Sequence, residues 1–373
     1  MELDYLITGG NGFIGSNLMP NILARDPEAS IINLDLRRDD AMEERMGLSD
    51  HQGRYMFKEG NINELASFEH YLKVSDLVIN LASENDRSTF RERMEKFVLT
   101  NIMGARVLAD ACSRNGVPLL HLSTDEVYGS CPYTVQRRDE NAPLDPTNPY
   151  ATTMAAGERL VALSGKEGGI PIAILRACEV IGPNQSMNNL VPGSIKMIRE
   201  GKPPVVRGKS EDKFRDWVHV LDLCHAIELL GMSITGHVDL STREMPDQEK
   251  VTGRTVIHGT DIATQRDSPG IPKTTERRVM SGVAIFNVTS ELRETVSSIV
   301  KRVLSAMGSE LPIRESRDPA YKDLGYNPSG KKLSYQGWQA KYTDLDSIIT
   351  STVEWYMEHP EVVEMPGSSH LMP

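Results

Sequence analysis

The sequence predicts an α/β fold in which a doubly wound parallel sheet carries a smaller, discontinuous α/β lobe. Three observations lead to this prediction. Apolar, strand-like runs alternate with helical patterns through the first half of the chain, a glycine-rich turn follows the first run, and the pattern becomes irregular after residue 178. Such alternation is typical of right-handed βαβ units, whose strands lie parallel in one sheet.

The predicted elements follow the chain in order. Strands are expected at residues 3–8, 31–35, 77–82, 119–123 and 172–176, and helices at residues 14–24, 97–113 and 150–163. The sheet domain is assigned to residues 1–178 and 216–240, and the second lobe to 179–215 and 283–358. Residues 241–282 are polar and lack periodicity, which indicates an insertion. Residues 359–373 are expected to form a loose tail.

Composition narrows the class of protein. The 373 residues are 39% hydrophobic and 25% charged, which is enough for a sizeable core in two or more units. A net charge of −11 argues against binding to nucleic acid or to an anionic membrane surface. The four cysteines have no metal-ligand spacing, no apolar run has the length of a membrane span, and the first strand begins at Leu3, leaving no room for a signal peptide. We therefore expect a cytoplasmic protein with reduced thiols.

The first predicted strand ends in the glycine-rich turn TGGNGFIG, with Gly9, Gly12 and Gly15 at the spacing of a dinucleotide-binding turn. Glycine is needed where the backbone turns sharply and where a side chain would block a pyrophosphate, and the following helix offers N–H groups to the phosphates. A glycine triplet alone is often only a turn. Its strand–turn–helix context favours a Rossmann-like cofactor site, which includes Phe13 and Ile14.

Asp35 ends the second predicted strand, 20 residues after Gly15. A carboxylate there can bind both adenosine ribose hydroxyls and would repel a 2′-phosphate, which favours NAD over NADP. Arg37 and Arg38 leave the alternative open, since either could accept a 2′-phosphate.

Other residues are assigned to the same cofactor site by their positions along the chain. Asn61 and Ile62 are placed to meet the adenine. The segment Leu81-Ala82-Ser83 ends a predicted strand at the expected cofactor edge. Simple packing is an alternative explanation for all of these residues. The remaining assigned residue is Asn101.

Adjacent carboxyl groups follow the strand predicted at residues 119–123, in the motif STDEVYG. Asp125 and Glu126, the acid pair, would lie at the carboxyl end of a parallel strand, where ligands bind. Neighbouring carboxyls can be held at different pKa values, so that one acts as an acid and the other as a base. Tyr150 follows Thr124 by 26 residues, at the start of a predicted helix.

The motifs TGGNGFIG, STDEVYG, NPYATTM, RDWVHVLDL and TVEWY resemble those of the NAD-dependent epimerase/dehydratase family of extended short-chain dehydrogenases. Within it, the chain looks most like the dTDP-glucose 4,6-dehydratases and related nucleotide-sugar dehydratases. The resemblance covers roughly residues 3–240 and 283–358. It implies an NAD-dependent lyase whose substrate is a hexose linked to a nucleoside diphosphate. It also implies a homodimer paired through the helices predicted at 97–113 and 150–163.

The resemblance implies a role for each matched residue. Tyr150 would take the proton of the sugar 4-hydroxyl, with Thr124 on the same oxygen, while NAD accepts the C4 hydride. Glu126 would then remove the C5 proton and Asp125 would protonate the departing 6-hydroxyl. The residues matched to nucleotide and diphosphate binding are Asn189, Leu190, Arg215 and Arg317.

Three positions depart from the family pattern. Met154 stands where the family has a lysine that binds the nicotinamide ribose and assists the tyrosine. A tyrosine without such help titrates near ~10, so it is a poor base at neutral pH. Glu179 replaces a usual asparagine and could face the substrate or solvent. The loop of residues 83–88 is two residues shorter than its counterpart, so the identity of the hexose is open.

These departures leave several activities open. A nucleotide-sugar 4,6-dehydratase is the leading expectation. The alternatives are a 5,6-dehydratase that returns the hydride to C4 and leaves an exocyclic alkene, a nucleotide-sugar epimerase, and a non-catalytic protein that binds NAD or nucleotide sugars. The 5,6-dehydratase resembles this chain in one respect, because the UDP-GlcNAc enzyme of that kind also carries Met at the position of Met154.

Overall fold

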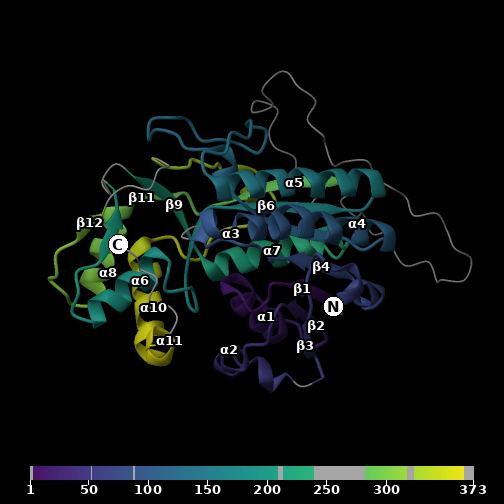
Figure 1. The fold of residues 1–373 in the computed structure, drawn as a ribbon, viewed down its shortest axis with the longest axis horizontal. Helices are drawn as coiled ribbons and strands as arrows, with labels where there is room; N and C mark the ends of the chain where they lie inside the picture. The colour runs from purple at the N-terminus through teal and green to yellow at the C-terminus, as the bar shows by residue number, and fades with distance from the viewer. Residues whose placement is uncertain are drawn as a thin grey trace, which may run out of the picture.

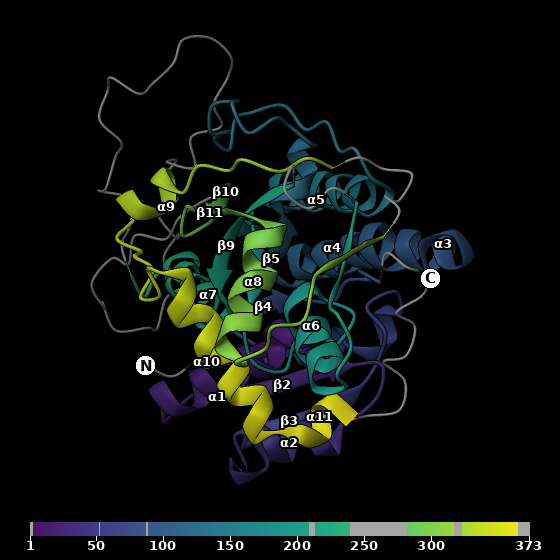
Figure 2. The ribbon, with the colours of Figure 1, turned by 90° about the vertical axis from the view of Figure 1, so that its left-hand side faces the viewer.

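The computed structural model describes residues 3–51, 53–86, 89–208, 213–238, 282–316 and 323–364. A large sheet flanked by helices forms one lobe, and a smaller lobe beside it contains α6 (Leu190–Arg199), α8 (Val296–Ala306) and α10 (Leu345–Glu358) (Figures 1 and 2). Except for residue 282, the predicted insertion at 241–282 lies outside the described residues.

The main sheet has seven parallel strands in the order β10-β6-β5-β4-β1-β2-β3. Its strands are β1 (Asp4–Thr8), β2 (Ser30–Asp35), β3 (Tyr55–Glu59), β4 (Leu77–Asn80), β5 (Leu119–Thr124), β6 (Ile172–Ala177) and β10 (Val283–Val288). The order reverses between β1 and β4, so the carboxyl ends of these strands border the crevice in which doubly wound sheets bind ligands. The predicted fold class is confirmed.

Helices cover both faces of this sheet (Figure 1). On one face, α1 (Phe13–Arg25) and α7 (Val220–Ile234) contribute Leu18 and Leu223 to a buried cluster. On the other, α4 (Ala105–Asn115) and α5 (Pro149–Gly168) contribute Leu108 and Val161 to a second. Because the central strands are buried on both sides, they read as continuous apolar runs.

The smaller lobe has its own core. A three-stranded sheet runs in the order β11 (Leu292–Thr295), β9 (Phe214–His219) and β7 (Glu179–Ile181), and β12 (Arg314–Ser316) pairs with β8 (Val205–Arg207). Side chains of α6, α8 and α10 bury a third apolar cluster with α11 (Pro360–Glu364). Val362 and Val363 are buried, so the residues predicted to begin a loose tail form a short helix instead.

The structure moves two predicted boundaries. Strand β10, assigned to the second lobe from the sequence, lies beside β6 at the edge of the main sheet. Strand β9, assigned in part to the sheet domain, pairs with β7 and β11 in the smaller lobe. Both differences arise because a chain that crosses between the lobes several times leaves no change of composition at the crossing points.

The shorter elements complete the described chain. The helix predicted at 97–113 is interrupted, because a π-helical segment, η5 (Val98–Gly104), precedes α4. The others are α2 (Asp40–Arg45), α3 (Phe90–Phe97), α9 (Lys331–Tyr335), and the 3₁₀ turns η1 (Leu48–Asp50), η2 (Leu65–Ser67), η3 (Glu69–Val74) and η6 (Asp125–Tyr128). None of the described helices combines the length and apolar character needed to cross a membrane.

Candidate functional site

The glycine turn joins β1 to α1, and three of its four glycines are required for different structural reasons. Gly9 has a φ of +71°, and a Cβ there would lie 2.6 Å from the backbone of Ala82. A Cβ on Gly15 would lie 2.4 Å from the backbone oxygen of Gly10. A Cβ on Gly12 would meet only the Gly9 oxygen, at 3.2 Å. Gly12 therefore leaves open space at the N-terminus of α1, and Phe13 and Ile14 start that helix.

Asp35 lies beside this turn at the end of β2. Its carboxylate accepts hydrogen bonds from the backbone N–H groups of Asn11, at 3.0 Å, and Leu36, at 2.7 Å. Burial raises the pKa of Asp35 from its usual value, while the two N–H groups and the charge of Arg37 oppose the rise. The carboxylate is thus fixed to the glycine turn, as the sequence places it.

The two arginines after Asp35 differ in their contacts. Both side chains are exposed, and the Arg38 guanidinium binds Glu43 at 2.7 Å and Asp40 at 2.9 Å. A 2′-phosphate would have to compete with two carboxylates for Arg38. At Arg38, this arrangement favours the cofactor without that phosphate.

The remaining cofactor assignments rest on less specific surroundings. The Ile62 side chain is buried in the second apolar cluster, and the Asn61 side chain accepts from the backbone of Asn63. Asn101 bonds both backbone groups of Glu84 and the Thr153 hydroxyl, so it ties the segment after β4 to α5. That segment contains Leu81, Ala82 and Ser83, all half-buried beside the glycine turn.

The acid pair lies in η6, directly after β5. The Thr124 hydroxyl caps this turn by accepting from the Glu126 N–H at 3.3 Å. Only 3% of Asp125 and 4% of Glu126 is exposed. Burial, followed by the neighbouring charge of Glu126, raises the pKa of Asp125 well above its usual value, while Arg215 opposes the rise. The buried position of Asp125 therefore favours its protonated form relative to an exposed aspartate.

Tyr150 lies at the start of α5, where Pro149 begins the helix and Asn148 caps it by accepting from the Ala151 N–H at 2.8 Å. One turn later, Met154 is 4% exposed and packs in an apolar cluster that includes Tyr128 and Tyr150. The thioether thus fills an apolar space between the tyrosine and the residues that follow the acid pair. An unpaired ammonium group would be costly there.

Glu179 and Arg215 approach the acid pair from the smaller lobe. The charge of Glu179, at the start of β7, contributes to the raised pKa of Asp125, so Glu179 lies on the side of the acid pair. The Arg215 guanidinium lies 4.7 Å from the centre of the Tyr326 ring and donates to the Phe214 carbonyl.

The other residues assigned to the substrate lie at the start of α6 or beyond the described chain. Asn189 caps α6 without a side-chain cap bond and donates to the Ser186 carbonyl, and Leu190 follows it. Arg317 lies outside the described residues.

The sequence did not identify Asn148, Asp323 and Tyr326, which surround Glu126 in the structure. The Asn148 amide donates to Glu126 at 2.7 Å and to Asp323 at 3.0 Å. The Tyr326 hydroxyl donates to Glu126 at 3.1 Å. Only Asn148 has a local signal, because asparagine before a proline at a helix start is typical of an N-cap.

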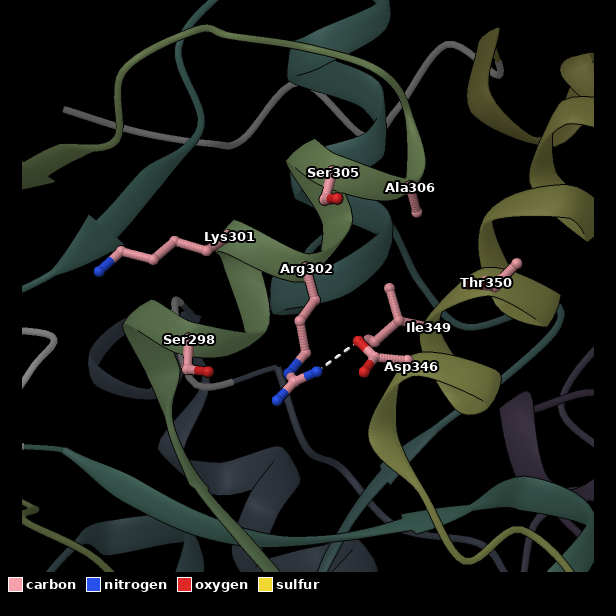
Figure 3. Close-up of a pocket in the computed structure, with 8 residues that line it drawn as sticks. All are labelled: Ser298, Lys301, Arg302, Ser305, Ala306, Asp346, Ile349 and Thr350. Atoms are coloured by element: carbon pink, nitrogen blue, oxygen red, sulfur yellow. Dashed lines mark hydrogen bonds and ion pairs between the residues drawn. The ribbon is translucent and has the colours of Figure 1, made fainter.

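A separate pocket of about 490 Å³ lies between α8 and α10 (Figure 3). It is lined in part by Lys301, Arg302 and Asp346, and an ion pair joins the last two. None of the predicted site residues lines it. The site described above is therefore defined by its side chains rather than by this pocket.

Comparisons with known proteins agree with this architecture. Residues 5–234 match the model described as "Epimerase: NAD dependent epimerase/dehydratase family". The low-salt glycan biosynthesis protein Agl12 of Haloferax volcanii is 32% identical over 361 residues, covering 96% of this chain and 100% of that protein. The dTDP-glucose 4,6-dehydratase of Mycobacterium tuberculosis is 26% identical over 357 residues, covering 95% of this chain and 93% of that enzyme.

Solved structures share the fold. A dTDP-glucose 4,6-dehydratase from Streptomyces venezuelae with NAD bound has a TM-score of 0.77 at 24% identity, covering 96% of this chain and 98% of that one. A UDP-glucuronic acid 4-epimerase from Bacillus cereus has a TM-score of 0.75 at 19% identity, covering 96% and 100%. Because both dehydratase and epimerase share the architecture, the fold alone does not decide the reaction.

Proposed function

The chain belongs to the NAD dependent epimerase/dehydratase family, and we propose that it is an NAD-dependent dehydratase of hexoses linked to a nucleoside diphosphate. The observation that carries this proposal is the acid pair. Burial raises the pKa of Asp125 and so favours its protonated form, and Glu126 is the adjacent residue. A group that donates a proton next to one that accepts a proton is what elimination of water requires.

The residues present fit NAD. The open space above Gly12 would admit a pyrophosphate at the N-terminus of α1, and Asp35 would bind the adenosine ribose. NAD, when bound, supplies reversible removal and return of a hydride. The chain has to position the sugar and move the protons.

Proton transfer is divided between two groups of residues. Tyr150 and Thr124 would bind the 4-hydroxyl, and Tyr150 would take its proton. With a ketone at C4, the C5 hydrogen becomes acidic and Glu126 would remove it. The bond from C6 to its hydroxyl then breaks as Asp125 gives that oxygen a proton. Water leaves, Glu126 is protonated and Asp125 is ionised.

The nucleotide would lie toward the smaller lobe. Asn189, Leu190, Arg215 and Arg317 are the proposed contacts, and arginine guanidinium groups suit phosphate oxygens. Glu179 lies near Asp125, which supports its facing the sugar.

Return of the hydride to C6, with a proton delivered by Glu126 to C5, gives a 4-keto-6-deoxy sugar, and this 4,6-dehydration is our first choice. A 5,6-dehydration is the second candidate, since Met154 is packed as an integral part of the site rather than exposed as a remnant. In the first product C6 is a methyl group and C4 is a ketone, whereas in the second C6 is the methylene carbon of an exocyclic alkene and C4 carries a hydroxyl group.

The test is to mix the purified protein with NAD and, in turn, UDP-, dTDP-, GDP- and CDP-hexoses in deuterated water. A dehydratase gives transient NADH absorbance and a product with deuterium at C5 or an exocyclic alkene in the NMR spectrum. A change of configuration at a sugar carbon without loss of water would show an epimerase. Binding without any NADH signal would show a non-catalytic protein.

We also propose that the protein is a cytoplasmic homodimer. All four cysteines are free and buried, as in a reducing compartment. Met94, Val98, Leu99 and Met103 are 39–55% exposed, at helical spacing along α3 and η5. Apolar side chains exposed on one helical face support pairing with a second copy. Leu99→Glu is expected to shift the mass measured by light scattering from dimer to monomer.

A further inference from the structure

Two donors converge on one oxygen of Glu126. The Asn148 amide donates to Oε2 at 2.7 Å, and the Tyr326 hydroxyl donates to the same oxygen at 3.1 Å. Glu126, Asn148 and Tyr326 are at most 6% exposed. Bulk water therefore does not compete with these hydrogen bonds, which fix the carboxylate in one orientation.

Tyr326 is itself fixed from several sides. Its ring lies 4.7 Å from the Arg215 guanidinium. The preceding residue, Gly325, accepts from the Cys131 N–H, and a Cβ on Gly325 would lie 2.5 Å from the ring of Phe214. The hydroxyl thus reaches Glu126 from a segment 200 residues away in the chain.

A second carboxylate, Asp323, shares these donors. Asn148 Nδ2 donates to Asp323 at 3.0 Å and the Thr147 hydroxyl donates at 2.7 Å. The Tyr326 hydroxyl is also among the groups that lower the pKa of Asp323. The two protons of the Asn148 amide face three acceptors, namely Glu126, Asp323 and, at 3.2 Å, the Tyr326 hydroxyl oxygen, whereas the Tyr326 hydroxyl has only one proton to donate. The Tyr326 hydroxyl can therefore donate to Glu126 or to Asp323, but not to both at the same time.

We propose that Tyr326 is a positioning residue for the base Glu126: its hydroxyl donates to Glu126 while that carboxylate is ionised, and donates to Asp323 once Glu126 has taken a proton from the substrate. This inference rests on the proposed function, in which Glu126 removes the C5 proton. Asp323 provides the second acceptor, so the hydroxyl keeps a partner in both states. An unsatisfied buried hydroxyl would otherwise oppose the transfer.

Several charged groups lie around Glu126. Asp125 is the adjacent residue, Asp323 shares the Asn148 amide with Glu126, the charge of Glu179 acts on Asp125, and Arg215 lies over Tyr326. Removing a hydrogen bond to an ionised carboxylate favours its protonated form, whereas removing a neighbouring negative charge favours its ionised form. Changes at Tyr326 and Asp323 should therefore have opposite signs.

The experiment compares Tyr326→Phe with Tyr356→Phe. Tyr356 is also fully buried in the smaller lobe, and its hydroxyl donates to the Gln185 carbonyl at 2.6 Å, so its variant loses a similar bond away from the acid pair. For each protein, NADH formation, uptake of solvent deuterium at C5 and the pH profile of kcat/KM are measured with a nucleotide sugar that the wild type converts.

Tyr326→Phe is expected to keep NADH formation, to slow C5 exchange about tenfold, and to move the acid side of the profile up by on the order of one pH unit. Asp323→Asn is expected to move the acid side down and serves as a second variant if Tyr326→Phe does not fold. Tyr356→Phe should leave both the rate of C5 exchange and the acid side of the pH profile unchanged.

Two results would overturn the inference. In the first, Tyr326→Phe matches Tyr356→Phe in C5 exchange and pH profile while the wild type is active, which rejects the role of Tyr326 alone. In the second, Tyr326→Phe and Asp323→Asn shift the profile in the same direction. A wild type that is inert toward every sugar would instead reject the proposed function, and the inference with it.

Discussion

The glycine turn between β1 and α1 takes its shape mainly from residues that are close in the chain, whereas the surroundings of Glu126 combine segments that are far apart. Gly9, Gly12 and Gly15 are fixed by contacts with their own turn and with the segment after β4. Glu126 is held by Asn148, at the start of α5, and by Tyr326, in the smaller lobe. The first region requires a particular backbone conformation, whereas the second requires a particular arrangement of hydrogen bonds around its carboxyl groups.

Glu126→Gln tests the proton-transfer region most directly. Loss of the base is expected to slow C5 exchange by about 10²–10⁴-fold, while NADH formation continues. Stopped-flow absorbance and NMR in deuterated water measure the two steps separately. The control is Glu228→Gln, a half-buried carboxyl on α7. If both steps failed together in Glu126→Gln alone, Glu126 would have a structural role instead.

Gly9→Ala tests the glycine turn. The new Cβ would meet the Ala82 backbone at 2.6 Å, at a φ of +71°. We expect a loss of about 3 kcal/mol in the free energy of unfolding, from strain and overpacking combined. Gly169→Ala, at a φ of +67° with no atom within 4 Å of the new Cβ, isolates the backbone strain and should lose about 1 kcal/mol. Equal losses in urea denaturation would show that packing against Ala82 is unimportant.

Asp125→Asn is expected to stabilise the protein at neutral pH by about 1 kcal/mol, because it removes a buried carboxyl group whose ionisation is opposed by burial and by the charge of Glu126. Burial raises the folded-state pKa of Asp125 above its unfolded value. As pH rises, the unfolded chain therefore releases this proton at a lower pH than the folded protein does. The free energy of unfolding of the wild type consequently falls as pH rises from about 4. The advantage of Asp125→Asn should disappear below that pH. Equal free energies of unfolding at neutral pH would contradict the raised pKa.

Met154→Lys is expected to have the smallest effect on the reaction itself, although placing its ammonium group in the apolar cluster should also lower the free energy of unfolding. A positive charge one helical turn from Tyr150 favours the ionised tyrosine, so the oxidation half-reaction should shift to lower pH by about half a unit. Thr152→Lys places the same charge on the exposed side of α5 and should leave the profile in place. An unchanged pH profile in Met154→Lys would count against Tyr150 as the base that deprotonates the 4-hydroxyl.

The contrast between the regions explains what the sequence could predict. The strands before Gly9 and Asp125 were predicted because apolar runs with turn residues are local patterns. The acid pair followed from its place after β5. Tyr326 and Asp323 could not be found, because no spacing in the chain links them to Glu126. The π-helical segment before α4 also has no periodic signal distinct from that of an α-helix.

The edge of the main sheet depends on a late part of the chain. Strand β6 is buried along its whole length between β5 and β10, and β10 begins at Val283, far downstream of Ala177. During synthesis on the ribosome, β6 emerges long before its outer neighbour exists. Until then the nascent chain presents an unpaired apolar strand, the kind of edge at which chains aggregate. Emergence of β10, rather than completion of the glycine turn, is therefore the point at which this edge of β6 is protected from aggregation.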